Sequence, residues 1–243
     1  VPLVEHNPLS AIKNNIFGTN IVATEAYRNN VENFVLISSD KAVRPTNIMG
    51  ATKRFAELIL QSLQDTVDSM PSNQCRTKYC LVRFGNVLDT SGSVVPLFKK
   101  QIESGGPVTV TDSRVIRYFM TIKEAVRLIL ITTTMTNGGD VFLLDMGEPV
   151  KIMYLAEQLI RLSGLNIKGK NNPQGDIEII CTGLRSGEKL YEELLIDSNA
   201  SKTEHSLIFK ANEKLINPRI LREKLEILKS SINKFDEAES LKI

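Results

Sequence analysis

The sequence predicts an α/β fold that contains the second half of a Rossmann-like parallel sheet and a smaller carboxyl-terminal lobe. Short apolar runs rich in Val and Ile alternate with stretches of helical periodicity along most of the chain, which is the pattern of βαβ units. Polar or glycine-bearing loops follow several of these runs directly, as at the ligand-binding edge of an open α/β sheet. A G-x-G-x-x-G loop is missing from the sequence, so only the second half of the sheet is expected.

The amino-terminal part predicts a helix, a strand and a second helix. Pro8 suits the first turn of a helix over residues 8–30. A turn and an apolar strand are expected over 31–39, because Val, Leu and Ile follow one another there. Asn47 is expected to cap a helix over 48–66. Polar residues therefore lie between the end of a strand and the start of a helix.

The same alternation continues through the rest of the chain. A strand over 79–84 is followed by a glycine-bearing loop and by a helix over 94–104, whose first turn accommodates Pro96. A turn leading into a helix is expected over 183–195. The remaining expected elements are strands over 108–111, 141–145 and 177–181, and helices over 122–134, 151–163 and 219–230.

Composition excludes several classes of protein. The 243 residues include 30 basic and 28 acidic side chains, and the net charge of +2 is too balanced to favour nucleic acid as a partner. No apolar run approaches the roughly 20 residues of a membrane span, and no signal peptide is visible. Cys75, Cys80 and Cys181 match no metal-binding spacing, so we expect reduced thiols, no metal site and a cytoplasmic location.

The stretch over residues 35–53, VLISSDKAVRPTNIMGATK, carries the most chemical information. Ser39 lies ten residues before Met49, and Lys53 lies four residues after it, so that Met49 and Lys53 share one face of the expected helix. Ser, Tyr and Lys at this spacing form the catalytic pattern of short-chain dehydrogenase/reductases. Met stands here at the Tyr position, and a thioether has no ionisable proton.

Longer blocks resemble the nucleotide-sugar 4,6-dehydratases of polysaccharide biosynthesis, within the extended short-chain dehydrogenase/reductases. The chain is similar to the larger, often membrane-anchored bacterial members that dehydrate UDP-N-acetylglucosamine. The matching blocks lie at 7–26, 34–54 (FVLISSDKAVRPTNIMGATKR), 83–102 (RFGNVLDTSGSVVPLFKKQI), 105–121 (GGPVTVTDSRVIRYFMT), 141–152 and 183–195 (GLRSGEKLYEELL).

The resemblance implies roles for the residues of the 35–53 stretch. Asp40 and Lys41 occupy the positions of the acid and the base that eliminate water. Ser39 would hydrogen-bond the region of the sugar 4-hydroxyl, and Lys53 would hold the nicotinamide ribose of NAD or NADP and lower the pKa of nearby hydroxyls. Met49 matches an alternative known at the tyrosine position. We expect a bound water, or Asp40 through the substrate, to take the proton of the 4-hydroxyl.

The resemblance also assigns the remaining binding residues. Ser38, Phe84 and Val87 would line the cofactor site with Lys53. The nucleotide part of a UDP-sugar would contact Asn86, Val94, Arg117, Arg185 and Glu188. Arginine suits a diphosphate because its planar fork binds two oxygens at once.

The resemblance further implies how the chain is divided. Residues 1–145 would form the carboxyl-terminal part of a Rossmann-like domain with interleaved substrate-binding segments. Residues 146–243 would be mainly the substrate-binding lobe and a helical tail. Because the chain begins with Val1 and lacks a phosphate loop, we expect a fragment or a processed chain, with a complementary amino-terminal chain or a second copy as its partner.

Three positions depart from the family pattern. Arg44 replaces a more usual Asn, Asp89 stands where Gly is usual, and Ser186 stands where Pro is usual. We expect the turn around Ser186 to be looser for lack of Pro.

Simpler interpretations of the same residues stay open. Adjacent Asp40 and Lys41 also suit a solvated ion pair, and Met49 suits a core position. Arg117 beside two aromatic residues suits a cation–π contact. Arg185 and Glu188 also suit the capping of a following helix.

Two other functions also fit the sequence. A nucleotide-sugar 4-epimerase of the same superfamily would not need the acid–base pair at Asp40 and Lys41, because it eliminates nothing. A non-catalytic remnant would bind a nucleotide sugar or a partner subunit without turnover, and the missing phosphate loop favours this alternative.

Overall fold

The computed structural model describes residues 1–71, 77–193, 200–211, 213 and 216–243. The chain divides into two compact units. The first unit comprises residues 1–84, 127–145 and 193–243, and the second comprises 85–126 and 146–192. The sequence predicts a single division of the chain, after residue 145. The structure groups 193–243 with the first unit instead, because a strand from this segment pairs with the sheet of that unit.

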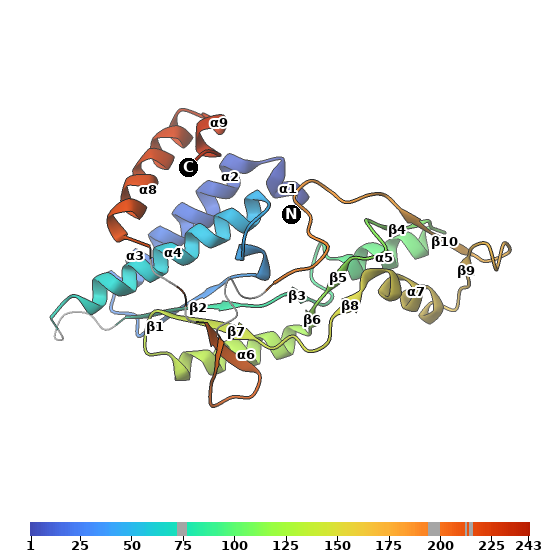
Figure 1. Cartoon of the computed structure of the whole chain (residues 1–243), viewed down its shortest axis with the longest axis horizontal. Helices are drawn as coiled ribbons and strands as arrows, with labels where there is room; N and C mark the ends of the chain where they lie inside the picture. Colours follow the sequence, from blue (N-terminus) through green and yellow to red (C-terminus); the bar gives the residue numbers. More distant parts are fainter. Residues whose placement is uncertain (72–76, 194–199, 212, 214–215) are drawn as a thin grey trace. The chain divides into compact units, whose positions relative to one another are not determined.

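The first unit is built on a five-stranded sheet in the order β1-β2-β7-β12-β11 (Figure 1). Its strands are β1 (Asn33–Ile37), β2 (Lys78–Arg83), β7 (Asp140–Leu144), β12 (Ile208–Ala211) and β11 (Ala200–Lys202). β1, β2 and β7 are parallel, which confirms the predicted Rossmann-like parallel sheet. β12 and β11 add an antiparallel edge that the sequence did not predict. β1 forms the opposite edge, and Ile37 at its end is 49% exposed.

Helices cover both faces of this sheet (Figure 1). The helix predicted over 8–30 is present as a continuous run whose middle, Lys13–Phe17, is a π-helical turn. The helices of the unit and of its connection to the second unit are α1 (Pro2–Glu5), α2 (Pro8–Ile12), α3 (Gly18–Arg28), α4 (Ile48–Asp68), α6 (Ile122–Met135), α8 (Pro218–Asn233) and α9 (Glu237–Ser240). The core under α3 and α4 is apolar and contains Leu36, Leu60, Tyr79, Leu81 and Val141.

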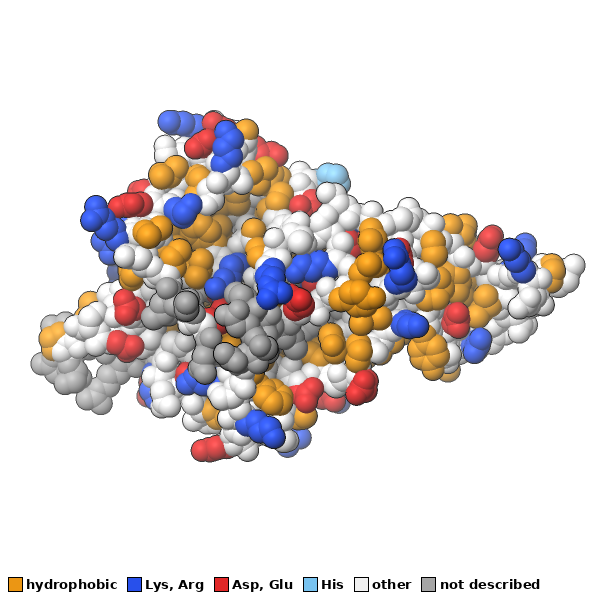
Figure 2. Space-filling model, in the orientation of Figure 1, with side chains coloured by type: hydrophobic (Ala, Val, Ile, Leu, Met, Phe, Trp, Pro, Cys, Tyr) orange, Lys and Arg blue, Asp and Glu red, His pale blue; other side chains and the backbone are white. Residues whose placement is uncertain are grey.

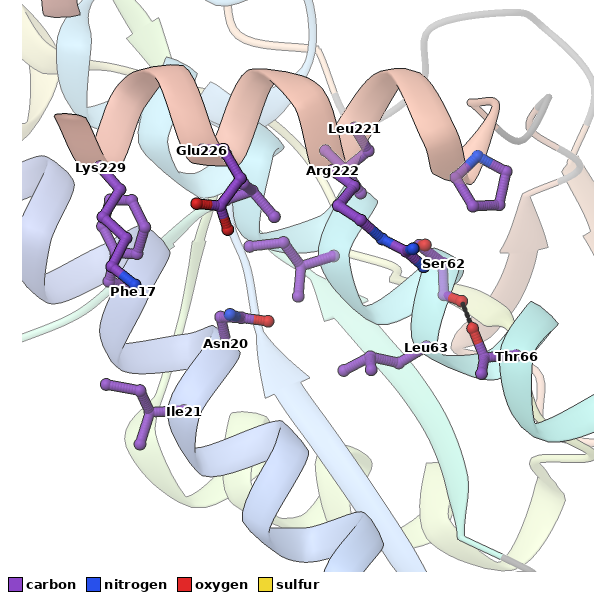
Figure 3. A pocket seen from close by; sticks show the side chains of 13 residues that line it. Phe17, Asn20, Ile21, Ser62, Leu63, Thr66, Leu221, Arg222, Glu226 and Lys229 are labelled. Carbon is purple, nitrogen blue, oxygen red and sulfur yellow. Dashed lines mark hydrogen bonds between the residues drawn. The ribbon is translucent and has the colours of Figure 1, made fainter. Parts of the chain in front are cut away.

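The carboxyl-terminal helix α8 packs on the helices of the first unit rather than extending away from it. Leu221 and Leu228 of α8 are buried against Ile12, Ile16 and Ile59. A pocket of about 370 Å³ lies beside this contact, between α8 and helices α3 and α4 (Figure 3). None of the predicted site residues lines it. On the face drawn in Figure 2, apolar side chains gather around α8, while basic and acidic side chains are interspersed.

The second unit has its own sheet and core. Strands β4 (Val108–Val110), β10 (Ile177–Cys181) and β9 (Ile167–Lys168) are parallel, in that order. Helices α5 (Val94–Glu103) and α7 (Ile152–Leu162) bury Phe98, Ile102, Ala156 and Ile160 against this sheet. Short ladders join β3 (Asn86–Val87) to β6 (Phe119–Met120) and β5 (Ile116–Arg117) to β8 (Val150–Lys151).

One predicted helix is absent from the part of its range that the structure describes. Residues 183–193 form turns and irregular backbone, and residues 194–199 lie outside the described residues. The alternative role of Arg185 and Glu188 as helix caps therefore has no support here. Within the described chain, no helix has both the length and the apolar character needed to cross a membrane.

Two of the departures from the family pattern fall at left-handed backbone positions. Arg44 has φ 42° and Asp89 has φ 61°, a region that Gly enters freely and Asn more readily than most residues. The Asn and Gly that the resemblance implies at these two positions would therefore suit the backbone better than Arg and Asp do.

We predict that Asp89→Gly raises the free energy of unfolding by about 0.5–1 kcal/mol, because relief of the left-handed strain exceeds the chain entropy that Gly adds. Urea denaturation measures this change. Asp89→Ala is the control: it removes the exposed ion pair with Lys99 (3.2 Å), which contributes little, but keeps a β-carbon at φ 61°. A gain with Ala equal to the gain with Gly would argue against backbone strain.

Candidate functional site

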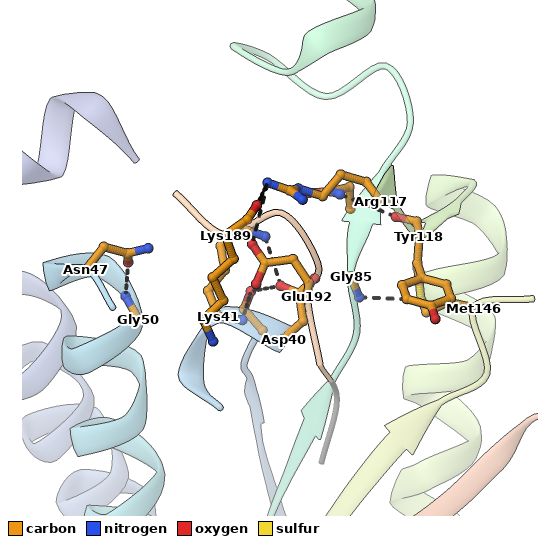
Figure 4. Close-up of polar contacts among 12 residues, drawn as sticks. Asp40, Lys41, Asn47, Gly50, Gly85, Arg117, Tyr118, Met146, Lys189 and Glu192 are labelled. Carbon is orange, nitrogen blue, oxygen red and sulfur yellow. Dashed lines mark hydrogen bonds and ion pairs between the residues drawn. The ribbon is translucent and has the colours of Figure 1, made fainter. Parts of the chain in front are cut away.

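The polar turn after β1 brings Ser39, Asp40 and Lys41 together. Ser39 caps a single 3₁₀ turn, Asp40–Ala42, by accepting a hydrogen bond from the backbone N–H of Lys41 (3.3 Å). The Ser39 hydroxyl donates to Oδ1 of Asp40 (2.8 Å), and the Lys41 ammonium donates to the same oxygen (2.8 Å). Figure 4 shows this ion pair. The backbone N–H of Asp40 bonds to the carbonyl of Phe84 (3.1 Å), which fixes the turn to the end of β2.

Asp40 is a buried carboxylate with one unused oxygen. Its residue is 1% exposed, so this is not the solvated ion pair considered from the sequence. Oδ2 of Asp40 is buried and has no hydrogen-bond partner among the described residues. Buried polar atoms are nearly always hydrogen-bonded, and an exception calls for an explanation, of which a catalytic role is one. An oxygen of this kind is suited to exchange a proton with a ligand.

The amino terminus of α4 is fixed by two side chains and one glycine. The Asn47 side chain accepts from the N–H of Gly50 (2.8 Å), which confirms the predicted cap (Figure 4). Glu5 of α1 accepts from the N–H groups of Ile48 (2.8 Å) and Met49 (3.3 Å). A carboxylate is stabilised at this end of a helix. A β-carbon on Gly50 would lie 2.1 Å from the carbonyl oxygen of Lys41, so α4 packs directly on the Asp40–Ala42 turn.

We predict opposite effects for two glycine substitutions in the helices of the first unit. Gly50→Ala is expected to lower the free energy of unfolding by about 2 kcal/mol or more, because the backbone of Lys41 must move. Gly18→Ala is expected to raise it by about 0.5–1 kcal/mol, because its β-carbon would meet only the Lys13 carbonyl at 3.9 Å. Thermal unfolding monitored by circular dichroism distinguishes the two. Equal effects would contradict the close contact at Gly50.

Met49 and Lys53 lie one turn apart on α4, as the spacing predicted. The Lys53 ammonium donates to the carbonyl of Ile37 (3.1 Å), at the carboxyl end of β1. Burial lowers the pKa of Lys53 below its ordinary value, and the nearby Glu57 carboxylate opposes this shift. The Lys53 ammonium therefore lies at the carboxyl end of β1, the edge of the sheet where open α/β folds bind ligands. A cation at this place would suit contact with a ribose.

A buried ion network lies beneath this turn, and the sequence did not predict it. Arg83 is 0% exposed and binds Glu57 through two hydrogen bonds, Nε to Oε1 (2.8 Å) and Nη2 to Oε2 (2.7 Å). Arg83 also binds Glu213, and Arg54 bridges Glu57 (2.9 Å) and Glu213 (2.7 Å). Burial opposes the ionisation of Glu213, but Arg83 and Arg54 outweigh it and lower the pKa of this carboxyl.

Ser38, which was predicted to contact the cofactor, belongs to this ion network. The Ser38 hydroxyl donates to Oε1 of Glu57 (2.5 Å), and Ser38 is 4% exposed. Its side chain therefore points into the fold, and a cofactor contact by Ser38 would have to come from its backbone. Phe84 is 9% exposed and holds Asp40 through its carbonyl. Val87 belongs to the second unit, on β3 beside Met120. The roles of all three residues toward a cofactor stay predictions.

The second unit contains a pocket that is lined by all five residues predicted to bind the nucleotide. Its volume is about 220 Å³. Asn86, Val94, Arg117, Arg185 and Glu188 line it, together with apolar residues of α5, β4 and α7. These five residues come from four separate segments of the sequence, and the second unit alone brings them to one cavity. Asn86 is held by its neighbour strand, with its N–H on the carbonyl of Tyr118 (3.1 Å).

The charged residues of this pocket differ in how they are held. The Arg117 guanidinium is largely buried and donates to backbone carbonyls of its own strand and of Lys189 and Leu190. Glu188 accepts from the Thr111 hydroxyl (2.9 Å) and from the N–H of Arg185 (3.1 Å). The Arg185 side chain is exposed and, among the described residues, has no hydrogen-bond or ion-pair partner. The cation–π alternative for Arg117 finds no support in these contacts.

The structure describes two of the three cysteines. Cys80 is buried and Cys181 is exposed, and neither is in a disulfide. Burial raises the pKa of the Cys80 thiol to about 11, so it is unreactive. Cys75 lies outside the described residues. Within the described ranges, no group of three or more His, Cys, Asp or Glu side chains is placed to hold a metal ion.

Sequence signals for the missed residues exist but are weak. Glu57 lies four residues after Lys53 on α4, where a helical neighbour is expected. Arg83 ends an otherwise apolar strand, and a charge in such a strand requires a partner. The partner Glu213 follows 130 residues later, and no local pattern predicts it. Glu5 and Thr111 likewise act through contacts distant in sequence.

Comparison with known proteins agrees with the resemblance. The family model described as polysaccharide biosynthesis protein matches residues 1–213. The capsular polysaccharide biosynthesis protein CapD of Staphylococcus aureus is 56% identical over 195 residues, which are 80% of this chain and 30% of that protein. The UDP-N-acetylglucosamine 4,6-dehydratase (inverting) of Campylobacter jejuni is 34% identical over 202 residues, 83% of this chain and 54% of that protein. Further relatives are named UDP-glucose 4-epimerase.

A solved structure supports the fold over almost the whole chain. The X-ray structure of Pen from Bacillus thuringiensis matches with a TM-score of 0.73 and 31% identity, over 94% of this chain and 72% of that one. The chain spans about half the length, or less, of the curated relatives named above. The match over residues 1–213, together with this fold, shows that the chain belongs to the polysaccharide biosynthesis protein family.

Proposed function

We propose that the chain forms the catalytic turn and the substrate pocket of an NAD(P)-dependent UDP-N-acetylglucosamine 4,6-dehydratase in surface polysaccharide or glycan biosynthesis. The observation that carries this proposal is the buried Asp40, whose Oδ1 is shared by Ser39 and Lys41 and whose Oδ2 has no partner among the described residues. The name of the Campylobacter jejuni relative supports the reaction. Catalysis is attributed to Ser39, Asp40, Lys41 and Lys53, with Met49 beside them.

The Asp40–Lys41 pair is suited to eliminate water from a 4-keto sugar. A proton shift along the 2.8 Å hydrogen bond between them turns the ion pair into an amine and a carboxylic acid. The Lys41 amine then takes the proton from C5, which the 4-ketone acidifies. Asp40 gives its proton to the 6-hydroxyl, so that the C6–O bond breaks and water leaves. The pair ends as it began, with ammonium and carboxylate.

The first step requires a base at the 4-hydroxyl, and Met49 cannot serve. We assign the proton to a bound water that passes it to the solvent, with the Lys53 ammonium stabilising the oxyanion, so that the Asp40–Lys41 pair is still an ion pair when elimination begins. A nicotinamide, when bound, supplies the acceptor and donor of the hydride. Lys53 fits its ribose, since the ammonium lies at the carboxyl end of β1. Phe84 and Val87 complete the proposed cofactor contacts.

The nucleotide part of the substrate is assigned to the pocket of the second unit. Arg185 offers an exposed guanidinium without a partner among the described residues, which suits a diphosphate. Asn86 offers an amide, and Val94 begins helix α5 at the pocket wall. The partner of the whole protein is thus a UDP-sugar. A second copy, or a chain that pairs with the open edge of β1, is a further proposed partner. A cytoplasmic location stays a prediction.

The test is to incubate the native protein that carries this chain with UDP-N-acetylglucosamine and either NAD or NADP. Mass spectrometry of the sugar nucleotide is expected to show a loss of about 18 Da, one water, as elimination by an acid–base pair requires. An unchanged mass with inversion at C4 would instead show the epimerase, which the relatives named UDP-glucose 4-epimerase favour. Tight binding of UDP without any change of the sugar would show a non-catalytic binding protein.

A further inference from the structure

Glu57 of α4 is a buried carboxylate that accepts four hydrogen bonds from the described residues. It is 0% exposed. Arg83 of β2 donates to both of its oxygens (2.8 and 2.7 Å), and Arg54 donates to Oε2 (2.9 Å). The fourth donor is the hydroxyl of Ser38 (2.5 Å), which shares Oε1 with Nε of Arg83. Because a buried carboxylate is costly without its donors, these bonds fix the position of Glu57.

The turn that begins at Asp40 is tied to β2 on both sides of Arg83. The N–H of Ser38 donates to the carbonyl of Val82 (2.8 Å). The N–H of Asp40 donates to the carbonyl of Phe84 (3.1 Å). Ser38 is therefore held twice, by its N–H on β2 and by its hydroxyl on the buried carboxylate of α4. This double anchor lies two residues before the carboxylate of the proposed acid–base pair.

The ion network is neutral as a whole, and Lys53 adds a further cation beside it. The two arginines of the network, Arg54 and Arg83, are matched by Glu57 and Glu213. Lys53 lies one turn before Glu57 on α4, and its ammonium donates to the last carbonyl of β1 (3.1 Å). If Glu57 lost its charge, Lys53 would lie beside two arginines and one carboxylate, which would favour the neutral amine.

Other charged groups near α4 are engaged elsewhere or are exposed. Asp40 and Lys41, in the turn that packs on α4, pair with each other (2.8 Å). Glu5 of α1 accepts from N–H groups in the first turn of α4. Exposed charged side chains, which solvent screens, also lie on the π-helical turn, α3 and α8: Lys13, Glu25, Arg28, Arg222, Glu226 and Lys229.

We propose that Glu57 is a positioning residue of the proposed reaction: its carboxylate anchors the Ser38 hydroxyl beneath the Asp40–Ala42 turn, and its charge lies beside Lys53. The proposal rests on the proposed function for the reaction that this turn and Lys53 catalyse. Glu57 acts without touching the substrate. The place of the acid–base pair and the charge of the oxyanion-stabilising Lys53 both depend on this one buried side chain.

The first measurement follows the titration of Lys53 in the native protein and needs no substrate. Acetylation by acetic anhydride across a range of pH, read by mass spectrometry, reports the fraction of Lys53 that is neutral amine. Glu57→Gln is expected to lower the titration midpoint of Lys53 by about one pH unit or more, because the ammonium loses its nearby negative charge. Glu57→Asp keeps the charge and is expected to restore most of this shift.

The control for this titration is Leu60→Ala, which removes a buried apolar side chain of the same helix. It is expected to destabilise the protein without moving the midpoint of Lys53. A midpoint that is unchanged in Glu57→Gln, or that moves equally in Leu60→Ala, would overturn the proposal.

The second measurement tests the anchor with a milder variant, which serves also if Glu57→Gln does not fold. Ser38→Ala removes only the hydroxyl bond to Glu57 and is expected to quicken amide hydrogen exchange at Asp40 about tenfold. Ser69→Ala makes the same change at an exposed position after α4, and exchange at Asp40 is expected to stay as in the wild-type protein. Unchanged exchange at Asp40 in Ser38→Ala would overturn the proposal.

The third measurement is turnover of UDP-N-acetylglucosamine. Glu57→Gln and Ser38→Ala are each expected to lower kcat about tenfold or more and to leave UDP affinity unchanged, because the nucleotide pocket belongs to the second unit. The alkaline limb of the pH–rate profile is expected to move to lower pH in Glu57→Gln and to stay in place in Ser38→Ala. Unchanged kcat in both variants would overturn the proposal. If the wild-type protein shows no turnover, the proposed function fails, while the Lys53 titration and the exchange at Asp40 still decide the role of Glu57.

Discussion

Replacing Asp40 by Asn is expected to lower the turnover of UDP-N-acetylglucosamine by about 10²–10⁴-fold, the usual contribution of a general acid or base. The amide keeps the shape of the side chain and can still accept from Ser39 and Lys41, but it cannot deliver a proton to the 6-hydroxyl. UDP binding is expected to stay unchanged, because the proposed nucleotide contacts lie in the second unit. Steady-state kinetics and calorimetry with UDP measure the two effects separately.

The control for Asp40→Asn is Asp65→Asn, which makes the same chemical change at an exposed position of α4. Its turnover is expected to match that of the wild-type protein. Lys41→Met is expected to reduce turnover as Asp40→Asn does, since the elimination needs both groups. If Asp40→Asn retained the wild-type rate, Asp40 would be a structural residue, and the assignment of the acid–base pair would be wrong.

Replacing Arg83 by Met is expected to lower the free energy of unfolding by about 3–5 kcal/mol, because it leaves buried carboxylates without their main cation. Glu57 is 0% exposed and, among the described residues, would keep Arg54 and the Ser38 hydroxyl as its hydrogen-bond partners. Urea denaturation measures the loss. Arg219→Met is the control: Arg219 pairs with Glu223 (3.0 Å) on the exposed face of α8, and its loss is expected to cost less than about 1 kcal/mol.

A second variant separates the charge effect from simple loss of packing. In Arg83→Met/Glu57→Met both main partners are replaced by apolar side chains, so no carboxylate of Glu57 is left uncompensated. This double variant is expected to be more stable than Arg83→Met alone, as for other buried pairs replaced together. A double variant less stable than the single one would show that packing, not charge, explains the effect of Arg83.

Local patterns in the sequence predict most of the helices and strands, because caps and apolar runs depend on residues close together in the chain. The α4 helix begins at Ile48 behind its Asn47 cap, as the sequence indicates, since capping depends on neighbours within three residues. The parallel strands β1, β2 and β7 follow from apolar runs. The antiparallel edge made by β12 and β11 was not predicted, because strands this short and partly polar give little periodic signal. The helix expected after residue 183 fails over 183–193, where Arg117 holds the backbone instead.

The candidate site likewise contains residues that local spacing places together and residues that only the fold brings together. The turn of Ser39, Asp40 and Lys41 and the cation at Lys53 follow from one continuous stretch, so spacing alone places them near one another. The gathering of Asn86, Arg117 and Arg185 in one pocket depends on the fold of the second unit. The inward direction of Ser38, toward Glu57 and Arg83, depends on pairs 19 and 26 residues apart. Residue type and spacing do not encode such partners.

We propose that Asp40 and Lys41 catalyse elimination across C5 and C6 of a UDP-sugar. The most direct measurement is the mass of the sugar nucleotide after the native protein has acted in D₂O and the product has been returned to H₂O. The predicted product is about 17 Da lighter than UDP-N-acetylglucosamine, because water is lost and C5 regains a deuteron in place of its proton. A sugar nucleotide of unchanged mass, with no deuterium on carbon, would rule out elimination by Asp40 and Lys41.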